Sequence, residues 1–142
     1  MKQLTLLLGS NLGDRRANIE AALVALDREF GPSRTAQSPV IETRACGFDG
    51  PDFLNCVVRY PSSFLPGQIL SKCKEIERSM GRTDTPEYDA EGQRIYHNRV
   101  IDIDILTYGK LKIKTPELTI PHPQIATRPF VRELLRNMQV FV

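Results

Sequence analysis

The sequence lacks the features that mark secreted, metal-knuckle and membrane proteins. Its three cysteines show no Cys-x-x-Cys spacing, which argues against a disulfide framework and a zinc site and favours a reducing cytoplasm. No stretch approaches the roughly 20 apolar residues of a membrane helix. The apolar start reaches Gly9 and Asn11 before a signal-peptide core is complete. We therefore expect a cytoplasmic protein.

Common catalytic motifs are missing as well. The chain contains no Gly-x-x-x-x-Gly-Lys-[Ser/Thr] run, no Gly-x-Gly-x-x-Gly after its first apolar segment, no Gly-x-Ser-x-Gly and no His-Glu-x-x-His. These absences exclude P-loop enzymes, dinucleotide-binding folds, serine hydrolases of the nucleophile-elbow type and helical zinc proteases. The formal net charge of +2 is too small to indicate a nucleic-acid partner.

The composition that remains is that of a folded enzyme-sized domain. With 142 residues, 41% hydrophobic and 25% charged, the chain predicts a single domain over residues 1–142. Periodicity and breaker residues predict strands at 3–8, 35–43, 53–60 and 100–106, a short segment at 111–113, and helices at 15–30, 65–80 and 130–137. The polar run 82–98 is predicted to be a long loop. The order βαββαβ predicts an α+β, ferredoxin-like sandwich, an antiparallel sheet with helices on one face.

The first two helices have predicted ends and apolar stripes. Asp14 is the predicted N-cap of the first helix, and Gly31 follows its end. Pro66 lies in the first turn of the second helix and Gly81 at its end. The residues predicted to face the core are Ile19, Leu23, Val24 and Leu26 in the first helix and Ile69, Leu70, Cys73, Ile76 and Met80 in the second.

Two carboxylates on the last long strand form the main candidate site. In the run 100–106, strand alternation directs Asp102 and Asp104 to one face and the isoleucines between them to the other. The carboxylates are then about 7 Å apart along the strand. Mg²⁺ prefers a few carboxylates together with water and phosphate oxygens. A solvated strand face would show the same alternation, so the pair alone leaves both interpretations open.

Cations near this strand strengthen the interpretation as a phosphate site. Arg82, Arg94 and Arg99 lie in or beside the predicted loop, and guanidinium groups match phosphate oxygens. His122 lies between two prolines that stiffen the backbone. Carboxylates, arginines and a long loop are what phosphoryl transfer requires.

Five ordered segments stand out along the chain: residues 8–14, 51–55, 75–82, 99–106, and Ile-Pro-His-Pro at 120–123 together with Arg-Pro-Phe at 128–130. Over nearly the whole chain, these segments resemble the 6-hydroxymethyl-7,8-dihydropterin pyrophosphokinase family. The resemblance implies a ferredoxin-like fold and transfer of pyrophosphate from ATP to the hydroxymethyl oxygen of the pterin, with release of AMP. It also implies a place in folate biosynthesis.

The resemblance further implies roles for individual residues at the ATP side. Asp102 and Asp104 are similar to the ligands of two Mg²⁺ ions, with Asp102 also near the pterin. The residues similar to ATP and phosphate contacts are Glu77, Arg82, Arg99, His122 and Arg128. Of these, Arg82 and Arg99 are expected to act in catalysis. Tyr96 stands where many members have tryptophan and is expected to cover the nucleotide, and Lys74 stands where glutamine is common.

The pterin side is implied by a second group of residues. Asn55 is similar to the residue that reads the pterin edge, and Phe53 and Phe130 resemble the aromatic faces between which the ring stacks. Thr43 and the backbone of Cys46 and Gly47 are expected to complete the pocket.

Two other interpretations stay open at this point. A ferredoxin-like RNA-binding module has the same element order, although negative charge on the strand at 102–104 argues against it. An inactive relative that binds pterin or nucleotide is the other. The partners expected are ATP and the pterin, with no nucleic acid, membrane or obligate protein partner.

Overall fold

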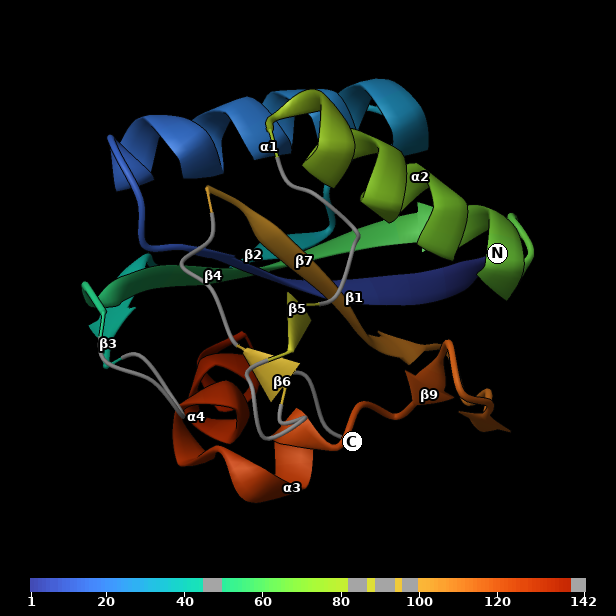
Figure 1. The fold of residues 1–142 in the computed structure, drawn as a ribbon. Helices are drawn as coiled ribbons and strands as arrows, with labels where there is room; N and C mark the ends of the chain where they lie inside the picture. Colours follow the sequence, from blue (N-terminus) through green and yellow to red (C-terminus); the bar gives the residue numbers. More distant parts are fainter. Residues whose placement is uncertain (45–49, 82–86, 89–93, 96–99, 139–142) are drawn as a thin grey trace.

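The structure is a computed structural model that describes residues 1–44, 50–81, 87–88, 94–95 and 100–138 (Figure 1). The strands are β1 (Lys2–Ser10), β2 (Ala36–Gln37), β3 (Ile41–Thr43), β4 (Phe53–Ser62), β5 (Glu87–Tyr88), β6 (Arg94–Ile95), β7 (Asp102–Tyr108), β8 (Ile113–Lys114) and β9 (Thr119–Ile120). The helices are α1 (Arg15–Phe30), α2 (Pro66–Ser79), α3 (Gln124–Thr127) and α4 (Pro129–Asn137).

The main sheet is antiparallel and follows the order β2-β4-β1-β7, with β3 also paired to β4. The central strand β1 lies between its two long neighbours, so that Gly9 is opposite Asn55 of β4 and Asp102 of β7. With the short strands β2 and β3 counted as one interrupted strand beside β4, the element order is βαββαβ, and this order and the sheet topology confirm the predicted α+β, ferredoxin-like architecture. The strand β7 ends the order and forms one edge of the sheet.

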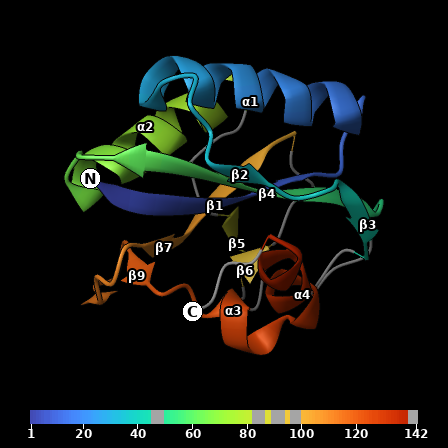
Figure 2. The same ribbon diagram turned by 180° about the vertical axis from the view of Figure 1, so that it is seen from behind.

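The helices α1 and α2 cover one face of the sheet (Figures 1 and 2). Asp14 caps α1 as predicted, accepting a hydrogen bond of 3.1 Å from the N–H of Ala17. The shared core contains Leu4, Leu6 and Leu8 of β1, Ile103 and Ile105 of β7, and Ile19, Leu23, Leu26, Ile69, Cys73 and Ile76 of the helices. Val24 is 57% exposed, so its predicted place in the buried stripe is wrong. Its side chain points away from the face of α1 that Ile19, Leu23 and Leu26 turn toward the core.

The helices α3 and α4 pack on the opposite face, which corrects the prediction that helices cover one face only (Figure 1). Their core joins Leu7, Val57 and Leu106 of the sheet to Val131, Leu134 and Leu135 of α4. The leucine run in β1 is apolar at successive positions, so both faces of that strand need cover. The closing helix supplies it on the second face.

Several predicted boundaries change in the structure. The extended segment at 35–43 is divided into β2 and β3 around Ser38, which donates from its N–H to Val57 O at 2.8 Å. Gly9 belongs to β1 and not to the loop that follows, whereas Gly13 has a φ of 64° and does lie in that loop. The predicted loop at 82–98 contains β5 and β6, paired with each other. Two-residue strands are too short to show a detectable alternation. No helix in the described ranges is long and apolar enough to cross a membrane.

Candidate active site

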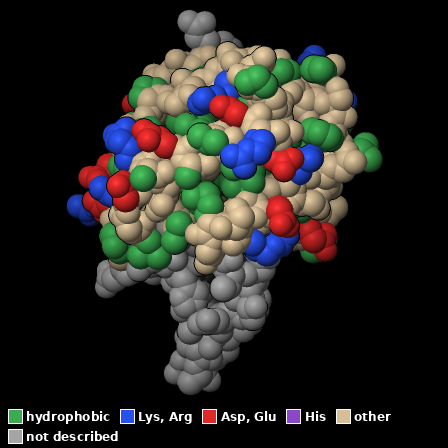
Figure 3. All heavy atoms as spheres, turned by 90° about the horizontal axis from the view of Figure 1, so that it is seen from above, with side chains coloured by type: hydrophobic (Ala, Val, Ile, Leu, Met, Phe, Trp, Pro, Cys, Tyr) green, Lys and Arg blue, Asp and Glu red, His purple; other side chains and the backbone are tan. Residues whose placement is uncertain are grey.

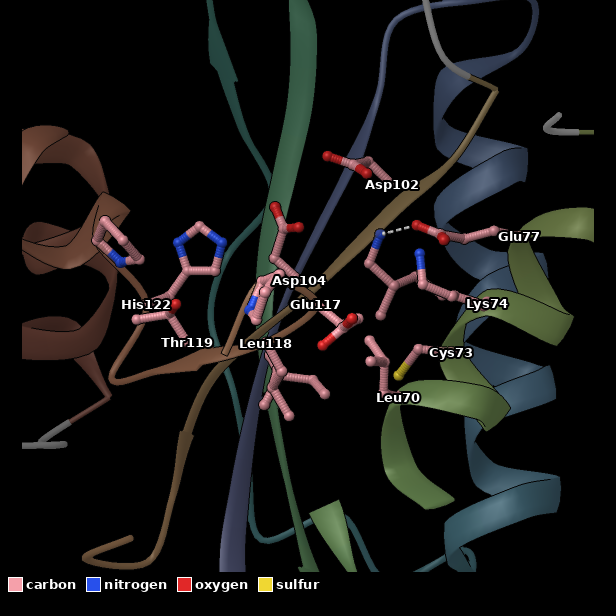
Figure 4. A pocket seen from close by; sticks show the side chains of 14 residues that line it. Leu70, Cys73, Lys74, Glu77, Asp102, Asp104, Glu117, Leu118, Thr119 and His122 are labelled. Atoms are coloured by element: carbon pink, nitrogen blue, oxygen red, sulfur yellow. Dashed lines mark hydrogen bonds between the residues drawn. The ribbon is translucent and has the colours of Figure 1, made fainter. Parts of the chain in front are cut away.

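The site forms around β7, at the edge of the sheet. Asp102 and Asp104 alternate with the buried residues Ile101, Ile103 and Ile105, and both carboxylates are half-buried. The shared orientation predicted from alternation is therefore confirmed. Figure 4 shows the two carboxylates at one cavity, which α2 borders on one side and the segment 116–123 on the other.

This cavity has a volume of about 320 Å³. Its ionisable lining residues are Cys73, Lys74, Glu77, Asp102, Asp104, Glu117 and His122. Leu70 of α2 and Leu118 give it an apolar part, away from Asp102 (Figure 4). The cavity thus combines a surface for a flat apolar group with carboxylates that suit a bound cation.

Glu77 fixes the position of α2 against β7. It is 3% exposed, and its Oε2 accepts a hydrogen bond of 2.8 Å from the N–H of Ile103 (Figure 4). The donor lies between the two aspartates in the sequence, so the bond also fixes the backbone that carries them. Glu77 lines the same cavity as the carboxylate pair, and its predicted role at the nucleotide stays a prediction.

His122 is held by backbone contacts on both sides. Its backbone N–H donates to Leu106 O at 2.9 Å, and its ring Nδ1 accepts from the backbone N–H of Gln124 at 3.1 Å. Because a backbone N–H can only donate, Nδ1 is the acceptor and Nε2 carries the proton of the neutral ring. Burial lowers the pKa of His122, although the Asp102 carboxylate opposes this effect. The ring is therefore a neutral donor aimed from the cavity wall.

Arg128 and Phe130 flank the start of α4. The guanidinium carbon of Arg128 lies 4.5 Å from the centroid of the Phe130 ring, an attractive cation–π contact. Nη1 of Arg128 also donates to Oε1 of Gln124 at 3.0 Å, and Nε2 of Gln124 donates to Oδ2 of Asp104 at 2.8 Å. Sequence reasoning missed Gln124. Its place two residues after a proline-flanked histidine was the available signal.

A second group of predicted residues, Thr43, Phe53 and Asn55, lies across β1 from the carboxylates, and we call it the Asn55 group. Asn55 is 4% exposed and its Nδ2 donates to Thr43 Oγ1 at 2.6 Å. Gly9 lies between Asn55 and Asp102 in the register. A Cβ at Gly9 would stand 3.2 Å from Asn55 Oδ1 and 3.4 Å from Phe53 Cδ1. The absence of a side chain at Gly9 therefore lets the Asn55 amide and the Phe53 ring lie close against this strand.

Contacts from the loop after β1 and from the first residue of α1 hold the segment that leads into the Asn55 group. Nδ2 of Asn11 donates to Pro51 O at 3.1 Å, and Nη1 of Arg15 donates to Asp52 O at 2.8 Å. Arg15 also pairs with Glu42 at 2.8 Å. These bonds fix the chain that leads into Phe53, a role that sequence reasoning did not assign to Asn11 or Arg15.

The oxygen donors of the carboxylate pair suit a hard divalent cation. Within the parts of the chain that are described, no group of three or more His, Cys, Asp or Glu side chains stands ready to hold a metal. Mg²⁺ does not require such a cage, because it is commonly bound by one or two carboxylates, water and substrate phosphates. The oxygen donors of Asp102 and Asp104 fit that pattern.

The structure brings together many of the residues predicted from the sequence. The cavity unites Glu77, Asp102, Asp104 and His122, and Arg128 joins them through Gln124. Thr43, Phe53 and Asn55 lie together as the Asn55 group. Five predicted site residues lie outside the residues that the structure describes: Cys46, Gly47, Arg82, Tyr96 and Arg99.

Comparisons with known proteins agree on one family. The model of the 7,8-dihydro-6-hydroxymethylpterin-pyrophosphokinase (HPPK) family matches residues 5–140. A 2-amino-4-hydroxy-6-hydroxymethyldihydropteridine pyrophosphokinase from Porphyromonas gingivalis is 44% identical over 133 residues, 92% of this chain and 86% of the relative. The enzyme of that name from Bacillus subtilis is 33% identical over 125 residues, 87% of this chain and 70% of the relative.

A relative of different length adds to these. The mitochondrial folate synthesis bifunctional protein of Pisum sativum is 40% identical over 138 residues, which are 96% of this chain and 25% of that protein. The match therefore covers nearly the whole chain and one part of the larger plant protein. With the family model spanning both the carboxylate strand and the Asn55 group, this chain belongs to the 7,8-dihydro-6-hydroxymethylpterin-pyrophosphokinase family.

Proposed function

We propose that the protein transfers pyrophosphate from ATP to the hydroxymethyl oxygen of 6-hydroxymethyl-7,8-dihydropterin, with release of AMP, in folate biosynthesis. Membership of the family over residues 5–140 supports this function. The observation that carries it at the site is the carboxylate pair Asp102 and Asp104. This pair lines a cavity that also has an apolar part and lies one strand away from the Asn55 group.

The carboxylate pair is proposed to hold two Mg²⁺ ions. Bound there, Mg²⁺ would supply neutralising charge to the triphosphate and bring phosphate oxygens close to the carboxylates. Both carboxylates are half-buried, and Asp104 is oriented by Gln124. Carboxylates in such surroundings bind a cation without large rearrangement of the protein.

ATP is proposed to occupy the cavity beside α2. Leu70 and Leu118 would contact the adenine, and Lys74 and the Nε2–H of His122 would donate to phosphate oxygens. Arg128 would add a further cation from the start of α4. These assignments rest on the lining of the cavity and on the neutral Nε2–H form of His122. Glu77 would act indirectly, by holding the backbone of β7. Arg82, Tyr96 and Arg99 are proposed as additional nucleotide contacts from the resemblance.

The pterin is proposed to bind beside the Asn55 group, across β1 from the carboxylates. The ring would stack against Phe53 and Phe130, and Asn55 would pair with the polar edge of the heterocycle. The Nδ2 of Asn55 already donates to Thr43, which fixes the amide so that its oxygen faces Gly9. The Cys46 and Gly47 backbone is proposed to close this pocket.

The two sites are adjacent because Gly9 separates Asn55 from Asp102 by a single strand. In the transfer, the hydroxymethyl oxygen forms a bond to the β-phosphorus and loses its proton. The bond from the β-phosphorus to the oxygen that it shares with the α-phosphorus breaks, and AMP leaves with this oxygen. The residues contribute by aligning the two substrates and by stabilising charge on the transferring group. Arg82 and Arg99 are proposed to take part in that stabilisation.

The interpretation as an RNA-binding module gains no support from the surface. Figure 3 shows basic and acidic side chains interspersed on the face of α1 and α2, without a large patch of one sign. The other face of the sheet is packed by α4. A binding module of this fold needs exposed strands and a basic surface. The buried thiols of Cys56 and Cys73 fit the proposed cytoplasmic location.

The deciding experiment measures AMP by chromatography after the protein is incubated with ATP, Mg²⁺ and 6-hydroxymethyl-7,8-dihydropterin. We expect AMP only when all three are present, and its loss in the double variant Asp102→Ala, Asp104→Ala. Glu133→Gln, an exposed carboxylate on α4, is the matched control and should keep wild-type activity. Absence of AMP from the wild type, or its persistence in the double variant, would refute the assignment.

A further inference from the structure

Gln124, the first residue of α3, contacts three separate groups of the proposed site. Its side-chain Nε2 donates to Asp104 Oδ2 at 2.8 Å, and its Oε1 accepts from Arg128 Nη1 at 3.0 Å. Its backbone N–H donates to His122 Nδ1 at 3.1 Å. One half-buried residue thus links a proposed metal ligand, a proposed phosphate-binding cation and a proposed phosphate donor.

The chemistry of the carboxamide fixes its orientation between its two side-chain partners. A carboxylate can only accept and a guanidinium can only donate, so the NH₂ group must face Asp104 and the carbonyl must face Arg128. Rotating the amide by 180° would set like partners against each other at both ends. The side chain of Gln124 therefore has one favourable orientation, which joins β7 to the start of α4.

A neutral amide suits this place better than a charged residue. A glutamate could accept from Arg128, but it would place a second negative charge beside Asp104 and offer it no donor. A lysine or arginine would pair with Asp104 but would compete with a cation for the carboxylate and repel Arg128. The carboxamide orients the carboxylate without neutralising it, which is how outer partners of metal ligands commonly act.

We propose that Gln124 is a positioning residue that holds Asp104 for metal binding and couples it to Arg128. This inference rests on the proposed function, because it assumes that Asp104 binds the metal and that Arg128 binds phosphate. Residue 124 then transmits the arrival of a nucleotide phosphate at Arg128 to the metal ligand on β7, through two consecutive hydrogen bonds.

The fold of α3 does not depend on this carboxamide. The helix is held by backbone bonds such as that from the Arg128 N–H to Gln124 O at 2.9 Å, and its core contact is made by Ile125. Substitutions of the Gln124 side chain should therefore leave the protein folded. A purely structural role would change thermal stability and leave metal binding unaltered, which separates the two explanations.

The first test measures binding of Mn²⁺, used as a paramagnetic substitute for Mg²⁺, by electron paramagnetic resonance. The nucleotide is α,β-methylene-ATP, which cannot release AMP, so no turnover is involved. We expect Gln124→Met to weaken Mn²⁺ binding by about 10- to 100-fold. Gln124→Leu, which also removes the donor to Asp104 and the acceptor for Arg128, should weaken it to a similar extent. Gln37→Met, at an exposed glutamine of β2, is the control and should bind Mn²⁺ as the wild type does.

The second test isolates the coupling to Arg128. A double-mutant cycle with Gln124→Met and Arg128→Met is measured by calorimetric binding of α,β-methylene-ATP in the presence of Mg²⁺. We expect the effect of Arg128→Met to be several-fold smaller once Gln124 is replaced. The separate chromatographic assay of AMP shows whether the proposed function holds. Unchanged Mn²⁺ binding in both Gln124 variants, or additive effects in the cycle, would overturn the inference even in an active enzyme.

Discussion

Glu77 on α2 accepts a hydrogen bond of 2.8 Å from the backbone N–H of Ile103 on β7. Ile103 lies between the two aspartates, and β7 ends the order of the main sheet. An N–H that points outward from an edge strand needs a partner when it is covered by a helix. Glu77 supplies that partner, so a single bond joins the packing of α2 to the backbone geometry of the carboxylate pair.

Replacing Glu77 should therefore affect stability as well as activity. Glu77→Ala leaves the Ile103 N–H without its acceptor, and we expect the free energy of unfolding to fall by about 1–3 kcal/mol. Glu77→Gln keeps an acceptor oxygen and should lose less. Urea unfolding followed by circular dichroism measures both changes. Glu75→Ala on the same helix, where the side chain is 73% exposed, should change stability by less than about 0.5 kcal/mol. Equal stability of Glu77→Ala and wild type would contradict the prediction.

The absence of a side chain at Gly9 should matter for the pterin and not for the nucleotide. A Cβ there would stand 3.2 Å from Asn55 Oδ1, so Gly9→Ala is expected to raise the KM for the pterin about tenfold or more, with the KM for ATP nearly unchanged. Steady-state kinetics with each substrate varied in turn provides the measurement.

Gly67→Ala is the matched control for this change. A Cβ at Gly67 meets nothing within 4 Å, and Gly67 lies in the first turn of α2. We expect this variant to keep both KM values and to gain up to about 1 kcal/mol in stability, because alanine restricts the unfolded chain. A normal pterin KM in Gly9→Ala would contradict the proposal that the pterin binds beside the Asn55 group.

Lys74 should contribute to nucleotide binding through its charge. Among the cavity-lining residues that the structure describes, it alone carries a permanent positive charge. Loss of a charge-assisted hydrogen bond costs about 1.5–3 kcal/mol, so Lys74→Met is expected to weaken binding of α,β-methylene-ATP by tenfold or more. Lys72→Met, two residues away, removes a cation that pairs with Glu29 at 3.0 Å and should not change this binding. Calorimetry with both variants distinguishes a local contact from a general loss of charge on α2.

Alkaline pH should destabilise the protein through Tyr60 and Cys73. Burial raises the pKa of Tyr60 above its ordinary value of 10.0, and its hydrogen bond to Asp27 raises it further. Burial and then Glu77 raise the pKa of Cys73 above its ordinary value of 9.0. In the unfolded chain both groups ionise near their ordinary values, so the unfolded state binds fewer protons than the folded state above pH 9.

The stability that these groups contribute is therefore complete below about pH 9 and is lost as the pH rises toward the raised folded-state values. Each group should contribute a slope of about 1.4 kcal/mol per pH unit once its unfolded form is ionised. Urea unfolding between pH 8 and 11 measures this loss. Tyr60→Phe removes one ionisation and should give a smaller decline above pH 10. An equally steep decline in that variant would show that Tyr60 is not responsible.

The local pattern of the sequence was sufficient for much of the fold. Alternation over 100–106 predicted the shared face of Asp102 and Asp104, and the Asp14 cap and Gly31 marked the ends of α1, because strand period and capping depend on neighbouring residues only. The same patterns failed for Val24, which proved exposed, and for α4, which covers the second face of the sheet. Both outcomes depend on which surfaces the rest of the chain leaves open.

The sequence by itself determined the element order, the carboxylate pair and the family, since each is carried by short motifs whose residues are close in the chain. Only the tertiary structure decided that Gly9 separates Asn55 from Asp102, that Glu77 holds β7 and that Gln124 reaches Asp104. The physical reason is that contacts between residues 20 or more positions apart leave no periodic trace. They exist only where packing of the helices on both faces of the sheet brings the partners within reach.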